Sequence, residues 1–186
     1  MIKIFIDQGH NPQNPNAGAE ANGVREQDIT YAVGVELAGL LRTNPNFDVR
    51  LSRNSPDEQL GTSNATSLAA RVNAANSWGA NYFISLHCNA STNTNASGSE
   101  CYVYSFGSQA YNLGTWILVG LHDVTGLPNR GMRLNPSLFV LRRTNMPAVL
   151  VEMGYITNLH DARLLSTRPD LFARGIYNGI LDYFGF

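Results

Sequence analysis

Short apolar stretches typical of strands alternate along this chain of 186 residues with amphipathic stretches typical of helices. Residues 2–7 (IKIFID) form a nearly continuous apolar run, whereas residues 26–44 place apolar side chains at every third or fourth position. Strands that alternate with helices pair in parallel, because each helix carries the chain back across the sheet. The alternation therefore predicts an α/β fold: a single twisted, mostly parallel sheet of about six strands with helices on both faces.

The expected elements follow one another without an internal repeat, a linker or a second domain. Strands are predicted at residues 2–7, 47–52, 81–87, 100–106, 137–142 and 147–153. Helices are predicted at residues 26–44, 66–79 and 108–126, in a short segment from Asn158, and after the TRPD sequence at 167–170. Thr66 is the expected cap of the second helix and Gly79 its expected stop, and TRPD is a capping-box variant. We expect residues 1–186 to form one domain.

Charge and hydropathy exclude several classes of partner. The formal net charge is -1, so the sequence offers no strongly basic surface for nucleic acid or an anionic membrane. No apolar run approaches the ~18 residues that span a bilayer. Met1 leads directly into the first strand, without the segments of a signal peptide. We therefore expect no nucleic-acid partner, no membrane insertion and no signal peptide.

The two cysteines, Cys88 and Cys101, are too few for a disulfide framework or a cysteine-built zinc site. They lie on two predicted strands that follow each other along the chain, which leaves a disulfide open as an alternative. We expect free, buried thiols, since cysteine is commonly a small core residue.

Residues able to bind a metal stand at the ends of three predicted strands. His10 follows the first strand, His87 ends the third, and Glu152 lies between apolar residues in the last. Ligands of open α/β sheets bind beyond the carboxyl ends of the strands, so these side chains converge if their strands are neighbours. Imidazole and carboxylate groups in threes, with a fourth position left for water, are typical of catalytic zinc. A buried charge such as Glu152 is costly unless it is paired, protonated or bound.

Other catalytic arrangements are absent or fit poorly. The sequence contains no G-x-S-x-G elbow, no phosphate-binding G-x-x-x-x-G-K-[ST] and no H-E-x-x-H. His87 and Cys88 are adjacent on a strand and point to opposite faces, so they cannot form a nucleophile–base pair. His122, in the last turn of a helix, and His160, in a first turn, are interpreted as structural. Any zinc site must therefore be assembled from distant segments.

Seven segments, in order over about 160 residues, carry a resemblance to a known family. They are residues 4–10 (IFIDQGH), 23–28 (GVREQD), 67–76 (SLAARVNAAN), 84–90 (ISLHCNA), 129–132 (NRGM), 139–158 (FVLRRTNMPAVLVEMGYITN) and 161–165 (DARLL). They resemble the type-3 catalytic domain of zinc-dependent N-acetylmuramoyl-L-alanine amidases. The resemblance implies one zinc ion per chain, bound by His10, Glu26 and His87, with Glu152 as the catalytic carboxylate.

Glu26 enters the site only through this resemblance, because a glutamate at a helix N-terminus is ordinarily a partner of the helix dipole. Glu20 is the competing carboxylate nearby, and the match to GVREQD favours Glu26. One departure concerns the loop after the first strand. The family has Asp-Pro-Gly-His-Gly-Gly there, whereas Asn11 and Pro12 follow the histidine here. Without glycines, the backbone of this loop has fewer accessible conformations. This difference affects the expected shape of the substrate groove and does not affect the expected metal binding.

The implied reaction is hydrolysis of the amide that joins N-acetylmuramic acid to the L-alanine of the stem peptide in peptidoglycan. We expect a monomeric catalytic domain over residues 1–186, without a separate cell-wall-binding domain, that acts at the bacterial cell wall. Phage lysis, sporulation and autolysis all remain open, and so does excision from a longer protein. Arg71 and Arg130 suit ion pairs as well as substrate contacts, so neither is assigned to substrate binding.

Three other functions are consistent with parts of the sequence. A zinc peptidase or deacetylase acting on another cell-wall bond would use the same metal and base. A non-catalytic peptidoglycan-binding module would keep the groove without the chemistry, although such modules usually lose a site residue. A glycosidase would use Glu26 and Glu152 as its two carboxylates and would leave the histidines without a role.

Overall fold

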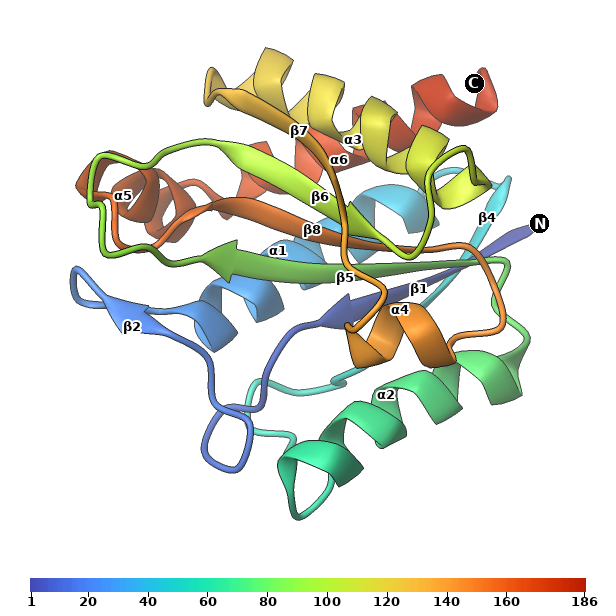
Figure 1. Cartoon of the computed structure of the whole chain (residues 1–186). Coiled ribbons are helices and arrows are strands. Elements are labelled where there is room, and N and C mark those ends of the chain that lie inside the picture. The colour runs from blue at the N-terminus through green and yellow to red at the C-terminus, as the bar shows by residue number, and fades with distance from the viewer.

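The computed structural model describes residues 1–186 as a six-stranded sheet with helices on both faces (Figure 1). The strands lie in the order β4-β1-β5-β8-β6-β7. Strands β4, β1, β5 and β8 are parallel to one another. Strand β6 is antiparallel to β8, and β7 is parallel to β6. The expected α/β fold with a mostly parallel sheet is confirmed.

The elements match most of the expected ranges. The sheet consists of β1 (Ile2–Gln8), β4 (Phe47–Leu51), β5 (Tyr82–Asn89), β6 (Ser99–Val103), β7 (Asn129–Leu134) and β8 (Ala148–Tyr155). Two further short strands, β2 (Glu20–Ala21) and β3 (Val24–Arg25), form a separate antiparallel pair. The helices are α1 (Glu26–Arg42), α2 (Asn64–Trp78), α3 (Gln109–Thr125), α4 (Phe139–Arg143), α5 (Leu159–Thr167) and α6 (Pro169–Phe184).

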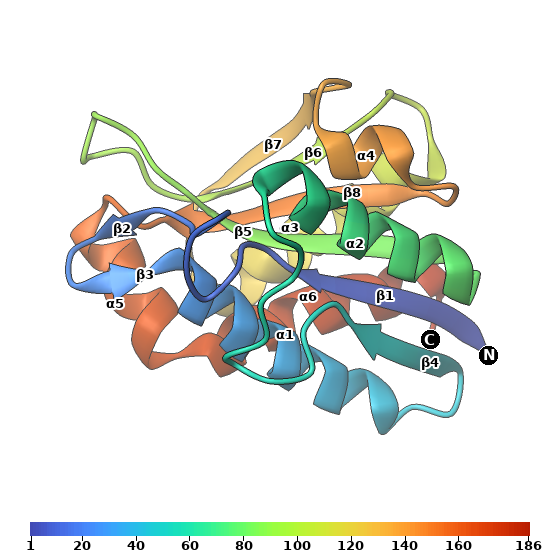
Figure 2. The ribbon, with the colours of Figure 1, turned by 90° about the horizontal axis from the view of Figure 1, so that it is seen from below.

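Two hydrophobic clusters hold the helices to opposite faces of the sheet. The larger cluster joins one face to α1, α3 and α6 through 29 buried residues. The smaller cluster of nine buried residues joins the other face to α2 and α4. Figures 1 and 2 show α2 and α4 together on that side. Along β8, Leu150 belongs to the smaller cluster and Glu152 lies two residues further on the same face. Polar residues therefore begin where the cover of α2 and α4 ends.

The strand expected at residues 137–142 is wrong, because this segment forms the short helix α4. Its apolar run is too short for periodicity to separate a strand from a buried helix. In the structure Val140 and Leu141 bury against the sheet within the smaller cluster. The sixth strand of the sheet is instead β7, whose sequence NRGMRL is polar and mostly exposed, as an edge strand can be.

Two expected helix starts are corrected. Ser63, not Thr66, is the N-cap of α2, and Thr66 closes a capping box by bonding back to the Ser63 backbone. Helix α6 begins at Pro169 with Arg168 as N-cap and no side-chain cap, so the expected capping box does not form. Gly79 ends α2 as expected, with a left-handed φ of 68° that suits glycine.

Cys88 and Cys101 are free and buried in the larger cluster, as expected. Strand β8 separates their strands, β5 and β6, in the sheet. None of the helices combines the length and apolar character needed to cross a membrane.

Candidate metal centre

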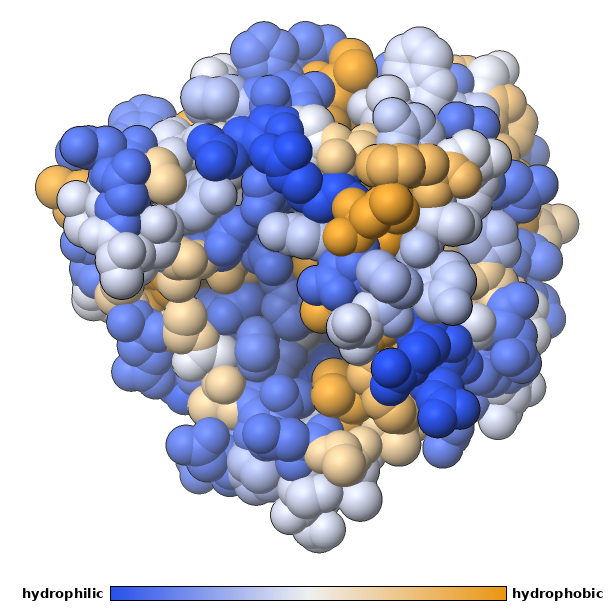
Figure 3. All heavy atoms as spheres, viewed as in Figure 1, coloured by the Kyte–Doolittle hydropathy of each residue, from blue (hydrophilic) through white to orange (hydrophobic).

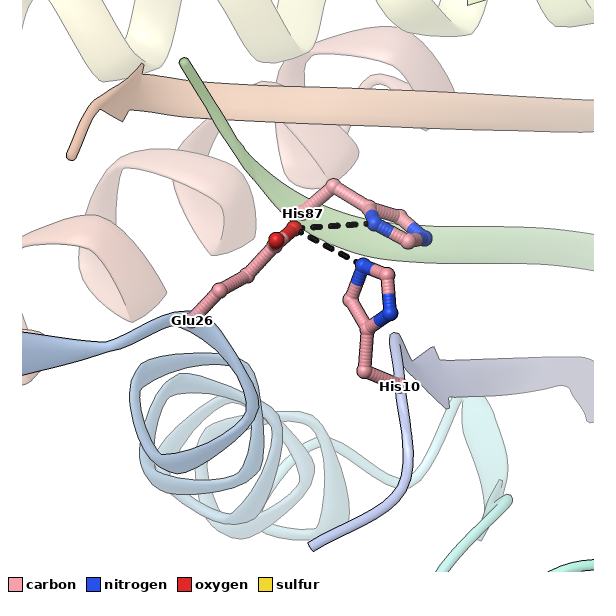
Figure 4. Close-up of side chains that lie close together, drawn as sticks. All are labelled: His10, Glu26 and His87. Atoms are coloured by element: carbon pink, nitrogen blue, oxygen red, sulfur yellow. Dashed lines mark hydrogen bonds and ion pairs between the residues drawn. The ribbon is translucent and has the colours of Figure 1, made fainter. Parts of the chain in front are cut away.

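Three side chains from distant segments meet at one edge of the sheet (Figure 4). His10 follows β1, His87 lies near the end of β5, and Glu26 is the first residue of α1. The Oε1 atom of Glu26 lies 3.2 Å from His10 Nε2 and 3.1 Å from His87 Nδ1. All three potential ligand atoms lie within 4.8 Å of one another.

The backbone fixes the positions of the two histidines. Strands β1 and β5 are parallel neighbours, and the Gly9 amide continues their pairing by donating to the Leu86 carbonyl at 3.0 Å. The His87 ring packs directly on Gly9, where an added Cβ would approach the ring Cε1 to 2.5 Å. His10 itself has a φ of 69°, a left-handed conformation that is uncommon outside glycine. The chain turns sharply there and directs the His10 ring toward His87.

The carboxylate of Glu26 is held on both oxygens. Its Oε1 accepts from the Cys88 amide at 2.9 Å, and its Oε2 accepts from the Ala19 amide at 3.0 Å. Burial by itself would raise the pKa of Glu26, but hydrogen bonds and charge from His10 and His87 outweigh it and hold the pKa well below its usual range. The side chain is therefore ionised and oriented toward the histidines.

Glu20, the competing carboxylate, does not reach the histidines. Its side chain is mostly exposed on β2 and pairs with Arg25 at 3.2 Å. The structure thus brings Glu26, and not Glu20, to His10 and His87.

A buried arginine holds the turn that carries His10. Arg71, on α2, donates to the His10 carbonyl and to the Gln8 carbonyl, each at 2.6 Å. The same guanidinium pairs with Asp7 at 2.7 Å, and Ser85 donates to the other oxygen of that carboxylate. Burial would raise the pKa of Asp7, but the Arg71 charge and hydrogen bonds outweigh it, so the pKa is lowered. Arg71 therefore forms an ion pair within the protein, one of the two roles that the sequence leaves open.

Glu152 lies beside this group on the neighbouring strand. It is the direct cross-strand partner of His87 in the parallel β5–β8 pair, so both side chains point to the same face. Its Oε2 is buried and has no hydrogen-bond partner. Burial, together with the negative charges of Glu26 and Glu100, raises the pKa of Glu152 to about 8. A carboxylate in this environment readily holds or releases a proton.

The chemistry and spacing of His10, Glu26 and His87 fit zinc. Two imidazole nitrogens and one carboxylate oxygen are ligand types that zinc prefers, and catalytic sites use three protein ligands. Ligands ~2.0–2.1 Å from a common tetrahedral centre lie about 3.3 Å apart. The separations of 3.1 and 3.2 Å from Glu26 to the two histidines are close to this value.

Comparison with known proteins decides the family. The family profile described as N-acetylmuramoyl-L-alanine amidase matches residues 4–182. The chain belongs to this family.

Individual relatives agree over nearly the whole chain. The N-acetylmuramoyl-L-alanine amidase CwlM of Bacillus licheniformis is 37% identical over 188 residues, covering 99% of this chain and 69% of that protein. A sporulation-specific N-acetylmuramoyl-L-alanine amidase of Bacillus subtilis is 35% identical, with the same coverage of 99% and 69%. The catalytic domain of CwlV from Bacillus (Paenibacillus) polymyxa has a TM-score of 0.85 and 31% identity, covering 100% of this chain and 99% of that domain.

The remaining histidines of the amidase lie outside the group. His122 Nδ1 contacts the Leu127 carbonyl at 2.8 Å at the end of α3. His160 is 76% exposed on α5, with its ring 3.7 Å from Asp161. Neither belongs to the group of potential metal ligands.

A small pocket opens beside the histidines of the amidase. It has a volume of about 130 Å³ and lies between α2, α4 and the sheet. Its lining residues are Asp7, Gly9, His10, Asn16, Leu68, Arg71, His87, Leu138, Phe139, Val140 and Leu150. A larger hollow of the surface, about 810 Å³, lies elsewhere, near Arg50 and Trp78, and no histidine or cysteine lines it. Potential metal ligands converge only beside the smaller pocket.

Two further residues near the site are not indicated by the sequence patterns. Glu100 is buried on β6, directly opposite Glu152, and Arg133 lies 3.6 Å from Glu100 on β7. The sequence predicts β6 as an ordinary strand and does not predict β7, so neither residue could be placed at the site. The only available signal for Glu100 was the alternation of side chains along β6. Because Cys101 points into the core on one face, its neighbour Glu100 must point to the other face.

Proposed function

We propose that this amidase depends on one zinc ion, held by His10, Glu26 and His87, and that Glu152 is its general base and acid. The reaction of its family is hydrolysis of the amide between N-acetylmuramic acid and L-alanine in peptidoglycan. The observation that carries the proposal is the buried, unbonded Oε2 of Glu152 on the strand position next to His87. An unpaired carboxylate oxygen is costly to bury, and acid–base groups of active sites are found in such environments.

When bound, zinc supplies Lewis acidity that polarises the scissile carbonyl and lowers the pKa of water. The protein supplies the proton transfers. Glu152 Oε2 takes a proton from the attacking water while the oxygen of that water bonds to the carbonyl carbon. Glu152 Oε2 then gives this proton to the alanine nitrogen as the C–N bond breaks. The products are a lactyl carboxylate on the intact glycan and a free amino group on the stem peptide.

The bonds of Glu26 support its proposed role as a ligand and not as an acid–base group. Both its oxygens accept backbone hydrogen bonds, and the two histidines keep it ionised. A carboxylate held in this way is a fixed negative charge, which suits a ligand. The glycosidase alternative needs Glu26 and Glu152 as a free pair and leaves both histidines unexplained.

We also propose that residues 1–186 act as a catalytic domain and contain no cell-wall-binding domain, since every helix packs on one sheet. The enzyme acts at the cell wall, as its family and relatives do. We propose a monomer, because the group of His10, Glu26 and His87 is complete within one chain. Sporulation is one setting to test, because one relative is sporulation-specific.

Digestion of purified peptidoglycan tests the proposed function. The enzyme is incubated with and without a chelator, and the new chain ends are identified by mass spectrometry. We expect free L-alanine amino groups, no new reducing sugar ends, and loss of activity with the chelator that added zinc restores. New reducing ends would support a glycosidase, and cleavage at another amide would support a peptidase. Loss of acetyl groups would support a deacetylase. Binding without cleavage would support a non-catalytic module.

A further inference from the structure

A row of three acidic and imidazole side chains crosses the sheet at the site. His87 on β5 lies opposite Glu152 on β8, and Glu152 lies opposite Glu100 on β6. Directly opposite residues of neighbouring strands point to the same face. The row therefore leads from the proposed metal site, past the proposed base, to Glu100 and the edge strand β7.

Glu100 is buried and has more positive partners than its charge requires. Its Oε1 accepts from Asn89 at 2.8 Å and from the Tyr102 hydroxyl at 2.9 Å. Its Oε2 lies 3.4 Å from Arg130 Nε and 3.6 Å from Arg133 Nε. Two guanidinium groups thus face a single carboxylate that Asn89 and Tyr102 already satisfy in part. One positive charge remains in excess at this position.

The two arginines are held in place but remain accessible. Arg130 donates to the Ser97 carbonyl at 3.3 Å and stacks on the Tyr155 ring at 5.1 Å. The side chains of Arg130 and Arg133 are 35% and 49% exposed, although both point an Nε toward the buried Glu100. The space-filling view shows strongly hydrophilic side chains over β7, on the rim above the hollow of this face (Figure 3). Outer N–H groups of both guanidiniums are therefore free to bind an anion.

The charge balance of the site favours an anionic ligand. With zinc bound, the metal and the two arginines would carry four positive charges against at most three negative charges, those of Glu26, Glu152 and Glu100. Glu26 and Glu152 adjoin the metal site, so their negative charges offset the charge of the metal. The excess positive charge therefore lies on the β7 side, at the two arginines. Guanidinium groups with a fixed orientation recognise carboxylates well, through paired charge-assisted hydrogen bonds.

We propose that Arg133 and Arg130 form a subsite for the free carboxylate of the stem-peptide residue that follows L-alanine. This inference rests on the proposed function, because it takes the scissile amide to lie at the metal. The second stem residue of peptidoglycan is a D-glutamate joined through its γ-carboxyl. Its α-carboxylate is therefore free unless the cell wall amidates it. The subsite gives the enzyme a preference for stems that carry this charge.

The reach of the substrate is slightly shorter than the separation of the two strand backbones that carry His87 and Glu100. Two strand spacings, about 9–10 Å, separate the backbone of β5 at His87 from that of β6 at Glu100. Two peptide residues in extended form span about 7 Å. The guanidiniums of Arg130 and Arg133 gather around the Glu100 carboxylate, so they lie over β6 and not beyond the edge of the sheet. A carboxylate two residues from the scissile carbonyl can therefore reach them.

A pair of synthetic substrates tests the subsite: N-acetylmuramoyl-L-alanyl-D-glutamate and its D-isoglutamine analogue, both with the γ-carboxyl blocked as a methylamide to mimic the onward linkage of the stem. They differ only in whether the second residue carries a carboxylate or a neutral amide. We expect the zinc-loaded wild type to hydrolyse the acid with a kcat/KM at least ~5-fold higher than the amide, as one charge-assisted contact at an exposed site permits. The preference should shrink as salt is raised.

Arg133→Gln should bring the ratio of the two kcat/KM values close to one, and Arg133→Lys should keep part of the preference. Glu100 retains Asn89, Tyr102 and Arg130 as partners in both variants, so folding is preserved. The matched control is Arg174→Gln, on an exposed position of α6 on the opposite side of the sheet, which should keep the wild-type ratio.

The readout is a ratio, so a merely structural role of Arg133 would not move it. Equal hydrolysis of acid and amide by the wild type would overturn the subsite and leave the amidase activity intact. An Arg133→Gln variant that keeps the wild-type preference would overturn the role of Arg133. Failure to cleave either compound, while peptidoglycan also stays intact, would instead refute the proposed function.

Discussion

His87 and Glu152 lie directly opposite each other on the neighbouring parallel strands β5 and β8. Their relative position is set by the hydrogen-bond register of two central strands and not by a loop, which gives a reacting pair a rigid support. A slip of one residue in this register would turn Glu152 into the apolar cluster beneath the sheet. The same register brings Val151 and Met153 to that cluster, so core packing holds the proposed base in place.

The first prediction concerns the metal ligands. His87→Ala and His10→Ala should each abolish stoichiometric zinc, because three protein ligands leave little redundancy. His160→Ala is the control, since that side chain is 76% exposed on α5, and it should bind one zinc per chain. Metal content after dialysis, measured by mass spectrometry, checks both. Full occupancy in His87→Ala would show that the ligand set is wrong.

Much of this site could be predicted because its parts lie at strand ends. The apolar runs around His10, His87 and Glu152 identify three strands, and a parallel sheet brings the ends of neighbouring strands together. Glu26 could not be found in this way. It stands on a helix and has the pattern of an ordinary first-turn glutamate, so only the resemblance to a family indicated it.

The second prediction concerns the glycine beneath the His87 ring. In Gly9→Ala, the new methyl group would meet the Leu86 carbonyl oxygen at 2.4 Å and the ring at 2.5 Å, so the histidine must move. We expect zinc affinity to fall by at least ~10-fold, the scale of changes that disturb the support of a ligand.

Gly39→Ala is the matched control for this substitution. It lies on the exposed side of α1, where an added Cβ meets no atom within 4 Å. It should leave zinc affinity unchanged and raise the free energy of unfolding by about 0.5–1 kcal/mol, because alanine favours a helix. Competition with a fluorescent zinc chelator measures both affinities, and equal values for the two variants would contradict the packing argument.

The third prediction concerns the buried Arg71–Asp7 pair. Arg71→Met leaves Asp7 buried and unpaired, so the free energy of unfolding of the metal-free protein should fall by ~3–5 kcal/mol. Urea denaturation measures this change. The double variant Asp7→Asn/Arg71→Met should recover part of the loss, because it also removes the uncompensated charge. A double variant less stable than Arg71→Met alone would argue against this explanation.

The fourth prediction is the pH dependence of the same pair. Arg71 lowers the native pKa of Asp7 below its ordinary 3.8. A lowered native pKa stabilises the fold above the unfolded value, and the stabilisation is lost as pH falls through the native one. The stability advantage of metal-free wild type over Asp7→Asn should therefore be constant above about pH 5 and shrink below about pH 4. Urea titrations from about pH 6 down to about pH 2 measure it, and a constant difference throughout would contradict the lowered pKa.

Two parts of the fold were beyond sequence patterns for physical reasons. Residues 139–143 are rich in residues that suit strands, yet they form α4, because Val140 and Leu141 pack on the sheet as one helical turn. Strand β7 has only Met132 and Leu134 as apolar residues, and Leu134 is exposed, so no apolar run in the sequence reveals this edge strand. Tertiary contacts decide the conformation of both segments. They therefore also decide the position of Arg133, which lies on β7.

The last prediction concerns Glu152, whose environment explains why a carboxylate stands among apolar neighbours. Its Oε2 is buried and unbonded, and its pKa is raised by burial and by the charges of Glu26 and Glu100. Zinc would act in the opposite direction, so the bound metal brings the group to a balance in which it can both accept and donate a proton. No hydrogen bond from the protein offsets the cost of burying this oxygen, so it does not stabilise the fold in the way that a paired carboxylate does.

Glu152→Gln keeps the shape of the side chain and removes its basicity. The variant should fold and bind zinc normally, since Glu152 is not among the three ligands, and should hydrolyse peptidoglycan at least ~100-fold more slowly. Zinc content and thermal unfolding establish that the protein is intact, and release of amino groups gives the rate. A structural carboxylate would show the reverse: a small change in rate and a clear change in stability. Near-normal activity in a folded, zinc-loaded variant would rule out Glu152 as the general base, because no other unbonded buried carboxylate oxygen lies at the site.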